Sequence, residues 1–474
     1  MLKVFLNHSI VYTLGNILSR GIGILLIPLY TRFLNPTEYG IVDLFMIIGT
    51  IINLTIAMEV TQAIARYYQE ANSKQEKKEY VSTAFWFTLI VYGIYLIVSL
   101  LFIEELTLFV IGELSYKNVY LLATFSIFTS GIFYFTQNQL KWQMQPKNTM
   151  IVSVLNVVIV AKMVTILLLF TSLRLESIFI AQSVGNIVAM MLSIYFARYN
   201  YSFTFILNKL KEMLTFSYPL VFSSVAVFIS MYADRIAIQQ ILDLEQLGIY
   251  AIAFKFASIA GLVMYGFQSS LLPLITKHYK ETDTPRHLIE IFNFFCFFAF
   301  IIIFGAITFS KEVVVLFTTE QFYSSYELIP ILVLAVFFSN MYIFTPGLWL
   351  YKKTKTITKI SIFTCILNVL LNYLLIPYLG LIGAAIATFL SSSLNFILYV
   401  YQSQKYYYLE FNWIKLATLF LVTIVLACLI QYHLDNIIAL NIIIKIVCLF
   451  IFIIGILFFF NYDKYLITLF KRIK

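Results

Sequence analysis

The feature that most constrains the fold is a ladder of about fourteen apolar stretches, each long enough to cross a lipid bilayer. A hydrocarbon core of about 30 Å requires roughly 20 apolar residues in helical form. Unpaired backbone groups are costly in lipid, so only helices or a closed barrel can span it. The stretches lack the period-two alternation of barrel strands. We therefore expect an all-α polytopic membrane protein with about 14 transmembrane helices.

The composition agrees with this interpretation, because 61% of the 474 residues are hydrophobic and 12% are charged. A soluble domain of this length cannot bury so much apolar surface in one core. Lipid must therefore be part of the solvent. The predicted spans are 9–31, 39–62, 81–103, 119–140, 150–171, 177–197, 216–238, 247–270, 290–310, 326–348, 357–377, 382–401, 416–432 and 441–460.

The distribution of Lys and Arg predicts the orientation. With the N-terminus in the cytoplasm, the inner segments hold 23 of these residues and the outer connections hold 5. Cytoplasmic loops carry the excess of positive charge, so both termini are predicted to be cytoplasmic. The same alternation explains the net charge of +9 without nucleic acid, which would require a basic face on a soluble module. The first stretch is predicted to be a membrane span and not a cleavable signal, because Arg20 interrupts it and another span follows directly.

No motif in the sequence predicts a metal, a cofactor or catalysis. The four cysteines lie in apolar spans and the four histidines are scattered, so neither a disulfide framework nor ligand spacing is present. A phosphate-binding loop is also missing, which excludes a self-contained ATP-driven pump. A membrane glycosyltransferase would carry its catalytic acid on a substantial outer loop, and the outer connections are short. We expect a protein that is not an enzyme.

A faint internal repeat predicts two related halves. Segments 34–41 and 242–249 place Leu, Gly and Ile at the same offsets, and Gly380 to Ala384 echoes them between spans eleven and twelve. Six spans separate the first two copies, so the halves share one orientation, as in transporters with parallel repeats. The predicted organisation is an N-lobe over 1–213, a C-lobe over 214–402 and a two-helix tail over 403–474. Segment 205–214 is predicted to be an amphipathic helix in the membrane interface, and Pro219 a first-turn residue of span seven.

Ionisable residues inside spans are candidates for a functional cavity, because burying a charge in a bilayer costs about 2.5 to 3.5 kcal/mol. Arg20 lies on a polar stripe of the first span, and similar seams follow spans two, seven and eight. These seams predict a water-filled cleft with a cationic lining, suited to phosphate or carboxylate. Its predicted cations are Arg20, Lys255, Lys162 and Arg235, and its polar lining is Asn16, Asn53, Ser230 and Ser258.

Other interpretations of these charges stay open. Asp43, Glu59 and Asp234 either take part in ion coupling or pair helices, and Arg235 could pair with Asp234 or Asp43. Lys445 lies a few residues into the last span. It is predicted to extend its ammonium group to the membrane surface.

Two segments resemble a known family. Residues 28–41, and residues 232–235 leading into 247–255, are similar to the Wzx-type polysaccharide flippases of the multidrug/oligosaccharidyl-lipid/polysaccharide (MOP) exporter superfamily. The resemblance implies two six-helix lobes followed by two C-terminal helices. By position, Arg20, Arg235 and Lys255 match charged residues expected around the central cavity.

The resemblance also implies a function. Such proteins move an undecaprenyl-diphosphate-linked oligosaccharide, a unit of O-antigen or capsule, to the outer leaflet of the bacterial cytoplasmic membrane by alternating access. The expected partners are the lipid bilayer, a polysaccharide polymerase and a chain-length regulator. The alternative is an ion-coupled drug or metabolite exporter of the same superfamily.

Overall fold

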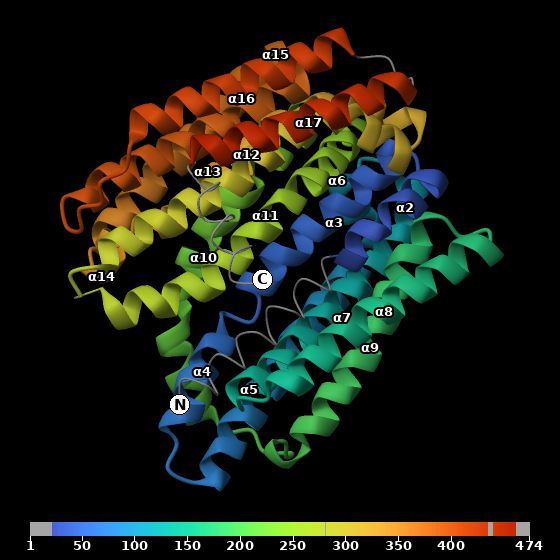
Figure 1. The fold of residues 1–474 in the computed structure, drawn as a ribbon. Helices are drawn as coiled ribbons and strands as arrows, with labels where there is room; N and C mark the ends of the chain where they lie inside the picture. Colours follow the sequence, from blue (N-terminus) through green and yellow to red (C-terminus); the bar gives the residue numbers. More distant parts are fainter. Residues whose placement is uncertain (1–20, 280, 435–438, 461–474) are drawn as a thin grey trace, which may run out of the picture. The chain divides into compact units, whose positions relative to one another are not determined.

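A computed structural model describes residues 21–279, 281–434 and 439–460, and within these ranges the chain is helical and has no β-strand (Figure 1). Short 3₁₀ turns join some of the α-helices. The α-helices are α2 (Ile27–Phe33), α3 (Pro36–Thr55), α4 (Val60–Glu70), α5 (Lys74–Leu101), α6 (Ile103–Val110), α7 (Lys117–Trp142), α8 (Pro146–Phe170), α9 (Leu175–Ala197), α10 (Leu207–Ile241), α11 (Leu244–His278), α12 (Thr284–Phe317), α13 (Ile329–Asn340), α14 (Gly347–Leu350), α15 (Thr354–Gln404), α16 (Trp413–His433) and α17 (Ala439–Phe459).

The predicted all-α polytopic fold is confirmed. Among the described residues, 10 helices are long and apolar enough to cross a membrane, or up to 11 if the pair Glu320–Glu327 and Ile329–Phe344, bent by 52°, forms one span. Predicted spans eleven and twelve lie together in α15. Of the first predicted span, only the part from residue 21 is described. The number of fourteen spans stays a prediction.

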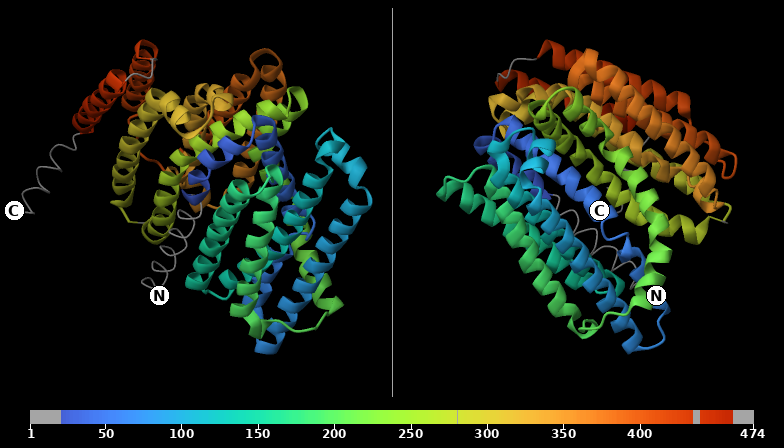
Figure 2. Two further views of the ribbon diagram at one scale, coloured as in Figure 1. Left: turned by 90° about the vertical axis from the view of Figure 1, so that its right-hand side faces the viewer. Right: turned by 180° about the vertical axis from the view of Figure 1, so that it is seen from behind.

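The chain divides into two compact units, which we describe separately (Figure 2). Unit 1 comprises Met1–Ala233 with Asp243–Gly248, and unit 2 comprises Asp234–Leu242 with Ile249–Lys474. The division falls inside α10 and inside α11, and not at the connection near residue 213. The predicted lobe boundaries stay a prediction.

The start of α10 differs from the sequence-based expectation. The segment predicted as a separate interfacial helix, 205–214, supplies the first turns of α10, which continues without interruption to Ile241. Pro219 consequently lies inside this helix and not in its first turn. A proline in a helix interior removes one backbone hydrogen bond, and neighbouring groups often compensate for this loss in membrane helices.

In unit 1, the helices α5, α7, α8 and α9 pack together through small and polar residues. A side chain at Gly131 would meet the Tyr92 ring at 2.0 Å, and one at Gly185 would meet Val160 at 2.5 Å. The Asn156 amide donates to Asn186 at 3.1 Å. Small residues allow close approach and amides hydrogen-bond across helices, as is typical of membrane bundles.

In unit 2, α15 folds back on itself at Gly380, whose φ of 57° and ψ of −136° break the helix. The Asn368 amide donates to Ser391 at 2.9 Å, and the Asn395 amide donates to Thr364 at 2.8 Å. These pairs are centred on the same position, so the two arms of α15 form an antiparallel hairpin. The left-handed φ explains the choice of glycine at the turn.

The predicted repeat is visible in the way that α3 and α11 begin. The Asn35 side chain caps α3 by accepting a hydrogen bond from the Glu38 backbone amide at 2.8 Å. The Glu38 carboxylate in turn accepts a hydrogen bond from the Asn35 backbone amide at 2.9 Å. Asp243 precedes α11 and accepts from the Gln246 amide at 2.8 Å. The two caps occupy equivalent positions of the repeated segments. The repeat therefore has a structural basis that the three shared residues only suggested.

Candidate functional site

A break in the second predicted span forms the first part of the candidate site. The helix predicted over 39–62 ends at Thr55, and Met58 and Glu59 adopt left-handed backbone conformations with φ of 48° and 52° before α4 begins at Val60. The prediction of one continuous span is wrong here. Left-handed conformations are unfavourable for residues with side chains and concentrate at functional positions.

The carboxylate of Glu59 is held inside unit 1 at this break. Glu59 is 7% exposed and accepts a short hydrogen bond from the Ser224 hydroxyl of α10. Two turns earlier, Asn53 accepts from the Tyr92 hydroxyl of α5 at 2.5 Å. These contacts fix the broken segment between α5 and α10. A buried carboxylate at a discontinuous membrane helix is a common arrangement around transporter sites.

A second polar cluster lies in unit 2, where Asp234 joins α10 to α11 and α15. Its carboxylate accepts from the Arg235 amide at 2.8 Å, from the Tyr250 hydroxyl at 2.5 Å and from the Thr388 hydroxyl at 3.4 Å. The Arg235 guanidinium lies over the Phe254 ring at 4.5 Å. Asp234 and Arg235 are 4% and 8% exposed. Both residues therefore contribute to the packing of helices inside unit 2.

The described cavity cations are distributed over both units. Arg20 and Asn16 lie outside the described residues. Lys162 is exposed on α8 of unit 1. In unit 2, Lys255 is half-buried on α11 and Arg235 is buried on α10. The cationic cavity and the roles of these residues stay predictions.

The other predicted site residues lie as follows. Asp43 is buried in α3 at 9% exposure. Ser230 is exposed, and its hydroxyl donates to the Ala226 carbonyl of its own helix at 3.1 Å. The Ser258 hydroxyl donates to the Lys255 carbonyl at 2.7 Å. Bonds of this kind satisfy a hydroxyl inside its own helix.

The placement predicted for Lys445 is wrong. The side chain does not extend to the membrane surface: it is fully buried in unit 2 and forms an ion pair with Glu312 of α12 at 2.5 Å. The Gln431 amide oxygen of α16 accepts a further bond from the ammonium group at 3.0 Å. The prediction fails because α12 and α16 supply partners for the ammonium group, so the charge of Lys445 is neutralised inside the unit. The pair connects α17 to α12 and α16.

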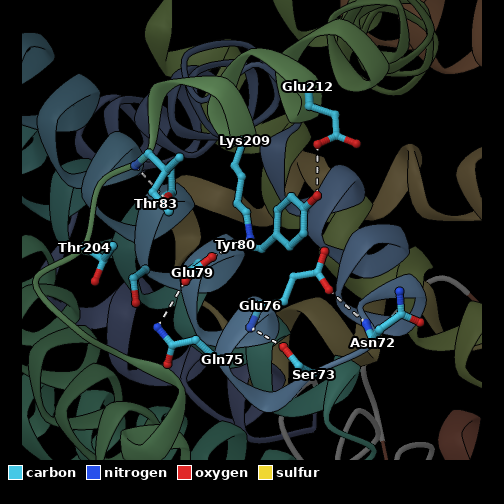
Figure 3. A network of polar contacts seen from close by, with 12 residues as sticks. Asn72, Ser73, Gln75, Glu76, Glu79, Tyr80, Thr83, Thr204, Lys209 and Glu212 are labelled. Atoms are coloured by element: carbon cyan, nitrogen blue, oxygen red, sulfur yellow. Dashed lines mark hydrogen bonds and ion pairs between the residues drawn. The ribbon is translucent and has the colours of Figure 1, made fainter.

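A third cluster, which the sequence analysis missed, lies at the predicted cytoplasmic end of unit 1 (Figure 3). The Tyr80 hydroxyl donates to Glu212 at 2.9 Å, and Lys209 pairs with Glu79 at 2.6 Å. Burial, with a smaller effect of the nearby Glu212 carboxylate, raises the pKa of the Tyr67 phenol. The sequence contains a signal for this cluster, because tyrosines and charged residues are mixed near the predicted cytoplasmic ends of the spans that contribute to it.

The sequence analysis also missed the partners of the predicted acids. Tyr250 and Thr388 bind Asp234, and Ser224 binds Glu59. Tyr250 lies in segment 247–255, which carries the family resemblance, so the sequence contains a signal for it. No pattern in the sequence marks Ser224 or Thr388. Among the described residues, no three His, Cys, Asp or Glu side chains come together to hold a metal ion.

Two family models match the chain. The model described as polysaccharide biosynthesis protein matches residues 5–279. The MatE model matches residues 219–374.

Two curated relatives are similar in sequence. The probable low-salt glycan biosynthesis flippase Agl15 of Haloferax volcanii is 24% identical over 44% of this chain, and the match spans 46% of that protein's length. The Lsg locus putative protein 1 of Haemophilus influenzae is 22% identical over 81% of this chain and 96% of its own length.

Solved structures with the same fold include two transporters. The lipid II flippase MurJ, in an inward closed conformation, has a TM-score of 0.75 and 17% identity, covering 94% of this chain and 98% of its own. An inward-facing multidrug resistance MATE family transporter of the MOP superfamily has a TM-score of 0.65 and 16% identity, covering 85% and 98%. The fold is thus that of these transporters.

Proposed function

Since the chain belongs to the polysaccharide biosynthesis protein family, we propose that it is a flippase for a lipid-linked oligosaccharide. The cargo is an undecaprenyl-diphosphate-linked repeat unit of O-antigen or capsule, which moves from the cytoplasmic to the outer leaflet. The protein then acts in the bacterial cytoplasmic membrane with both termini in the cytoplasm. A polysaccharide polymerase and a chain-length regulator would use the translocated unit.

The family match over 5–279 carries this proposal. Two other findings support it: the relative named as a glycan biosynthesis flippase, and the fold shared with a lipid II flippase. Agl15 and MurJ are named as flippases, and the MATE protein is named as a transporter. A flippase has no covalent step to perform, so its requirements are a path for the headgroup and two conformations.

The proposed mechanism assigns roles to the predicted charges. Arg20, Lys162 and Lys255 bind the diphosphate, because guanidinium and ammonium groups pair strongly with phosphate when water is scarce. Arg235 is held against Phe254 and supports α11. Alternating access requires that cargo or ion bind the two conformations differently. Glu59 and Asp234 are candidates for that role because both are buried carboxylates next to a helix break or a helix contact.

Deleting the gene tests the proposal. We expect lipid-linked repeat units to accumulate facing the cytosol and surface polysaccharide to disappear, with the wild-type gene restoring export. Arg20→Ala and Lys255→Ala are expected to fail to restore export although both proteins reach the membrane. Normal export by the deletion strain would overturn the proposed function. Normal export by a stably expressed variant would remove that residue from the cavity.

The second candidate function is an ion-coupled drug or metabolite exporter. The MatE match over 219–374 and the fold shared with a MATE transporter favour it. It predicts that the deletion strain becomes more sensitive to cationic drugs while surface polysaccharide stays normal. The two measurements on one strain therefore separate the candidates.

A further inference from the structure

An open depression of about 410 Å³ lies at the predicted cytoplasmic end of unit 1, between α4 and the first turns of α10. Its volume falls within the range of small-molecule sites. None of the charges proposed to bind the diphosphate lines it. Its lining residues are Tyr67, Asn208, Lys211, Glu212, Thr215 and Phe216.

The aromatic side of the depression is rigid. The Tyr67 ring stacks on Tyr80 with centroids 5.3 Å apart and 18° between the planes, and Phe216 meets Tyr67 edge-on at 6.1 Å and 82°. The Arg66 guanidinium lies 4.9 Å from the centre of the Phe216 ring. Such pairs stabilise one ring arrangement beyond the area that they bury. A ligand would therefore meet a preformed aromatic surface.

The polar side of the depression is held in place by the neighbouring network (Figure 3). Glu212 accepts from the Tyr80 hydroxyl at 2.9 Å, which orients its carboxylate. Lys209 is occupied by Glu79 at 2.6 Å and lies over the Tyr80 ring at 4.4 Å. Asn208, Lys211 and Thr215 are exposed at the rim. The depression thus combines one oriented carboxylate with an amide, an ammonium group and a hydroxyl.

We propose that this depression binds a sugar ring of the lipid-linked oligosaccharide on the cytoplasmic side. A pyranose has an apolar face of C–H groups, which suits the aromatic surface, and a rim of hydroxyls, which suits mixed donors and acceptors. The lining holds one cation and one anion, so it has no net charge to attract a diphosphate. The proposal rests on the proposed function, because a glycan linked to a lipid of the inner leaflet projects into the cytoplasm, where this site lies.

The test uses full-length protein in lipid nanodiscs and saturation-transfer NMR. The probe is the free repeat-unit oligosaccharide, released from the host's lipid-linked intermediates. The substitution Thr215→Trp introduces a large side chain into the depression from an exposed position and leaves Tyr67, Tyr80 and Phe216 unchanged. Leu207→Trp is the matched control, since Leu207 is 70% exposed on the same helix and does not line the depression.

We expect saturation transfer to the C–H protons of the sugar with wild type and with Leu207→Trp. With Thr215→Trp the affinity is expected to fall by at least about tenfold, equivalent to about 1.4 kcal/mol. Phe216→Ala is expected to weaken binding as well. Equal binding by wild type and Thr215→Trp would overturn the site, as would complete competition by inorganic pyrophosphate.

The failure of this site and the failure of the proposed function give different results. If the deletion strain exports polysaccharide normally, the flippase function is wrong whatever the purified protein binds. If export depends on the chain but Thr215→Trp both exports and binds the glycan as wild type does, only the sugar site is wrong. Loss of glycan binding in Thr215→Trp, with normal folding by size-exclusion chromatography, supports the site.

Discussion

Gly40 and Gly248 hold equivalent positions in the two repeated segments, and each lies against the backbone of the helix that carries the other. A side chain at Gly40 would meet the Leu244 carbonyl oxygen at 1.9 Å, and one at Gly248 would meet the Pro36 carbonyl oxygen at 1.9 Å. Pro36 and Leu244 are themselves equivalent in the repeat. The contact is therefore reciprocal, as expected for two copies related by an approximate two-fold axis.

We predict that Gly40→Ala destabilises the protein by more than about 3 kcal/mol, the upper end of ordinary overpacking. The obstacle is a backbone carbonyl, which cannot rotate away as a side chain can. Thermal unfolding followed by fluorescence-detected size-exclusion chromatography measures the effect. Gly93→Ala is the control, because nothing lies within 4 Å of its added carbon and alanine favours the helix by about 0.5–1 kcal/mol. Equal melting temperatures for the two variants would contradict the close contact.

A second prediction concerns the left-handed residues at the start of α4. Met58 has φ of 48° and is 37% exposed, so Met58→Gly relieves about 1–2 kcal/mol of backbone strain with little loss of packing. We expect a higher melting temperature. Met46 is 54% exposed inside α3, where Met46→Gly should cost about 1 kcal/mol. If both glycine variants melt lower than wild type by similar amounts, the strain at Met58 is not real.

The buried pair of Lys445 and Glu312 gives a third prediction. Lys445→Met leaves a carboxylate buried without its cation and is expected to cost about 3–5 kcal/mol. The double variant Lys445→Met with Glu312→Leu replaces both charges by apolar groups and should recover most of that loss. Thermal unfolding of the two single variants and the double variant in one detergent measures the coupling. Additive losses would show that the two side chains do not act as a pair.

The fourth prediction tests the cluster around Asp234. Tyr250→Phe removes the buried hydroxyl that donates to Asp234, and we expect a loss of about 1–3 kcal/mol because the carboxylate keeps fewer donors. Tyr373→Phe removes a hydroxyl that donates to Gln240, an exposed residue near the end of α10. Its expected cost is near the membrane-protein average of about 0.6 kcal/mol. Equal effects in thermal unfolding would argue against a structural role for Asp234.

Local sequence was enough to predict the all-helical fold class and the repeat. Long apolar runs have few alternatives in lipid, and the shared Gly40 and Gly248 reflect a close backbone contact that requires glycine. The alternation of basic residues also predicts the orientation from local sequence, because orientation depends on the composition of the connections and not on the packing of helices.

The details that involve distant partners could not be predicted. Neither Met58 nor Glu59 is a typical helix-breaking residue, and the hydroxyl that binds Glu59 comes from Ser224, 165 residues further on. Lys445 is predicted to reach the membrane surface because it lies only a few residues into its span, whereas its partner Glu312 lies 133 residues earlier. The depression beside Tyr67 likewise depends on α4 and α10 meeting in space.

The pairing of Glu312 with Lys445 has a consequence for biosynthesis. The ribosome completes α12 well before α17, so the membrane receives the acid 133 residues ahead of the base that neutralises it. Until α17 inserts, the nascent protein carries the largely buried Glu312 carboxylate without its counter-charge. A chain that stops short of α17 keeps this carboxylate without its partner permanently.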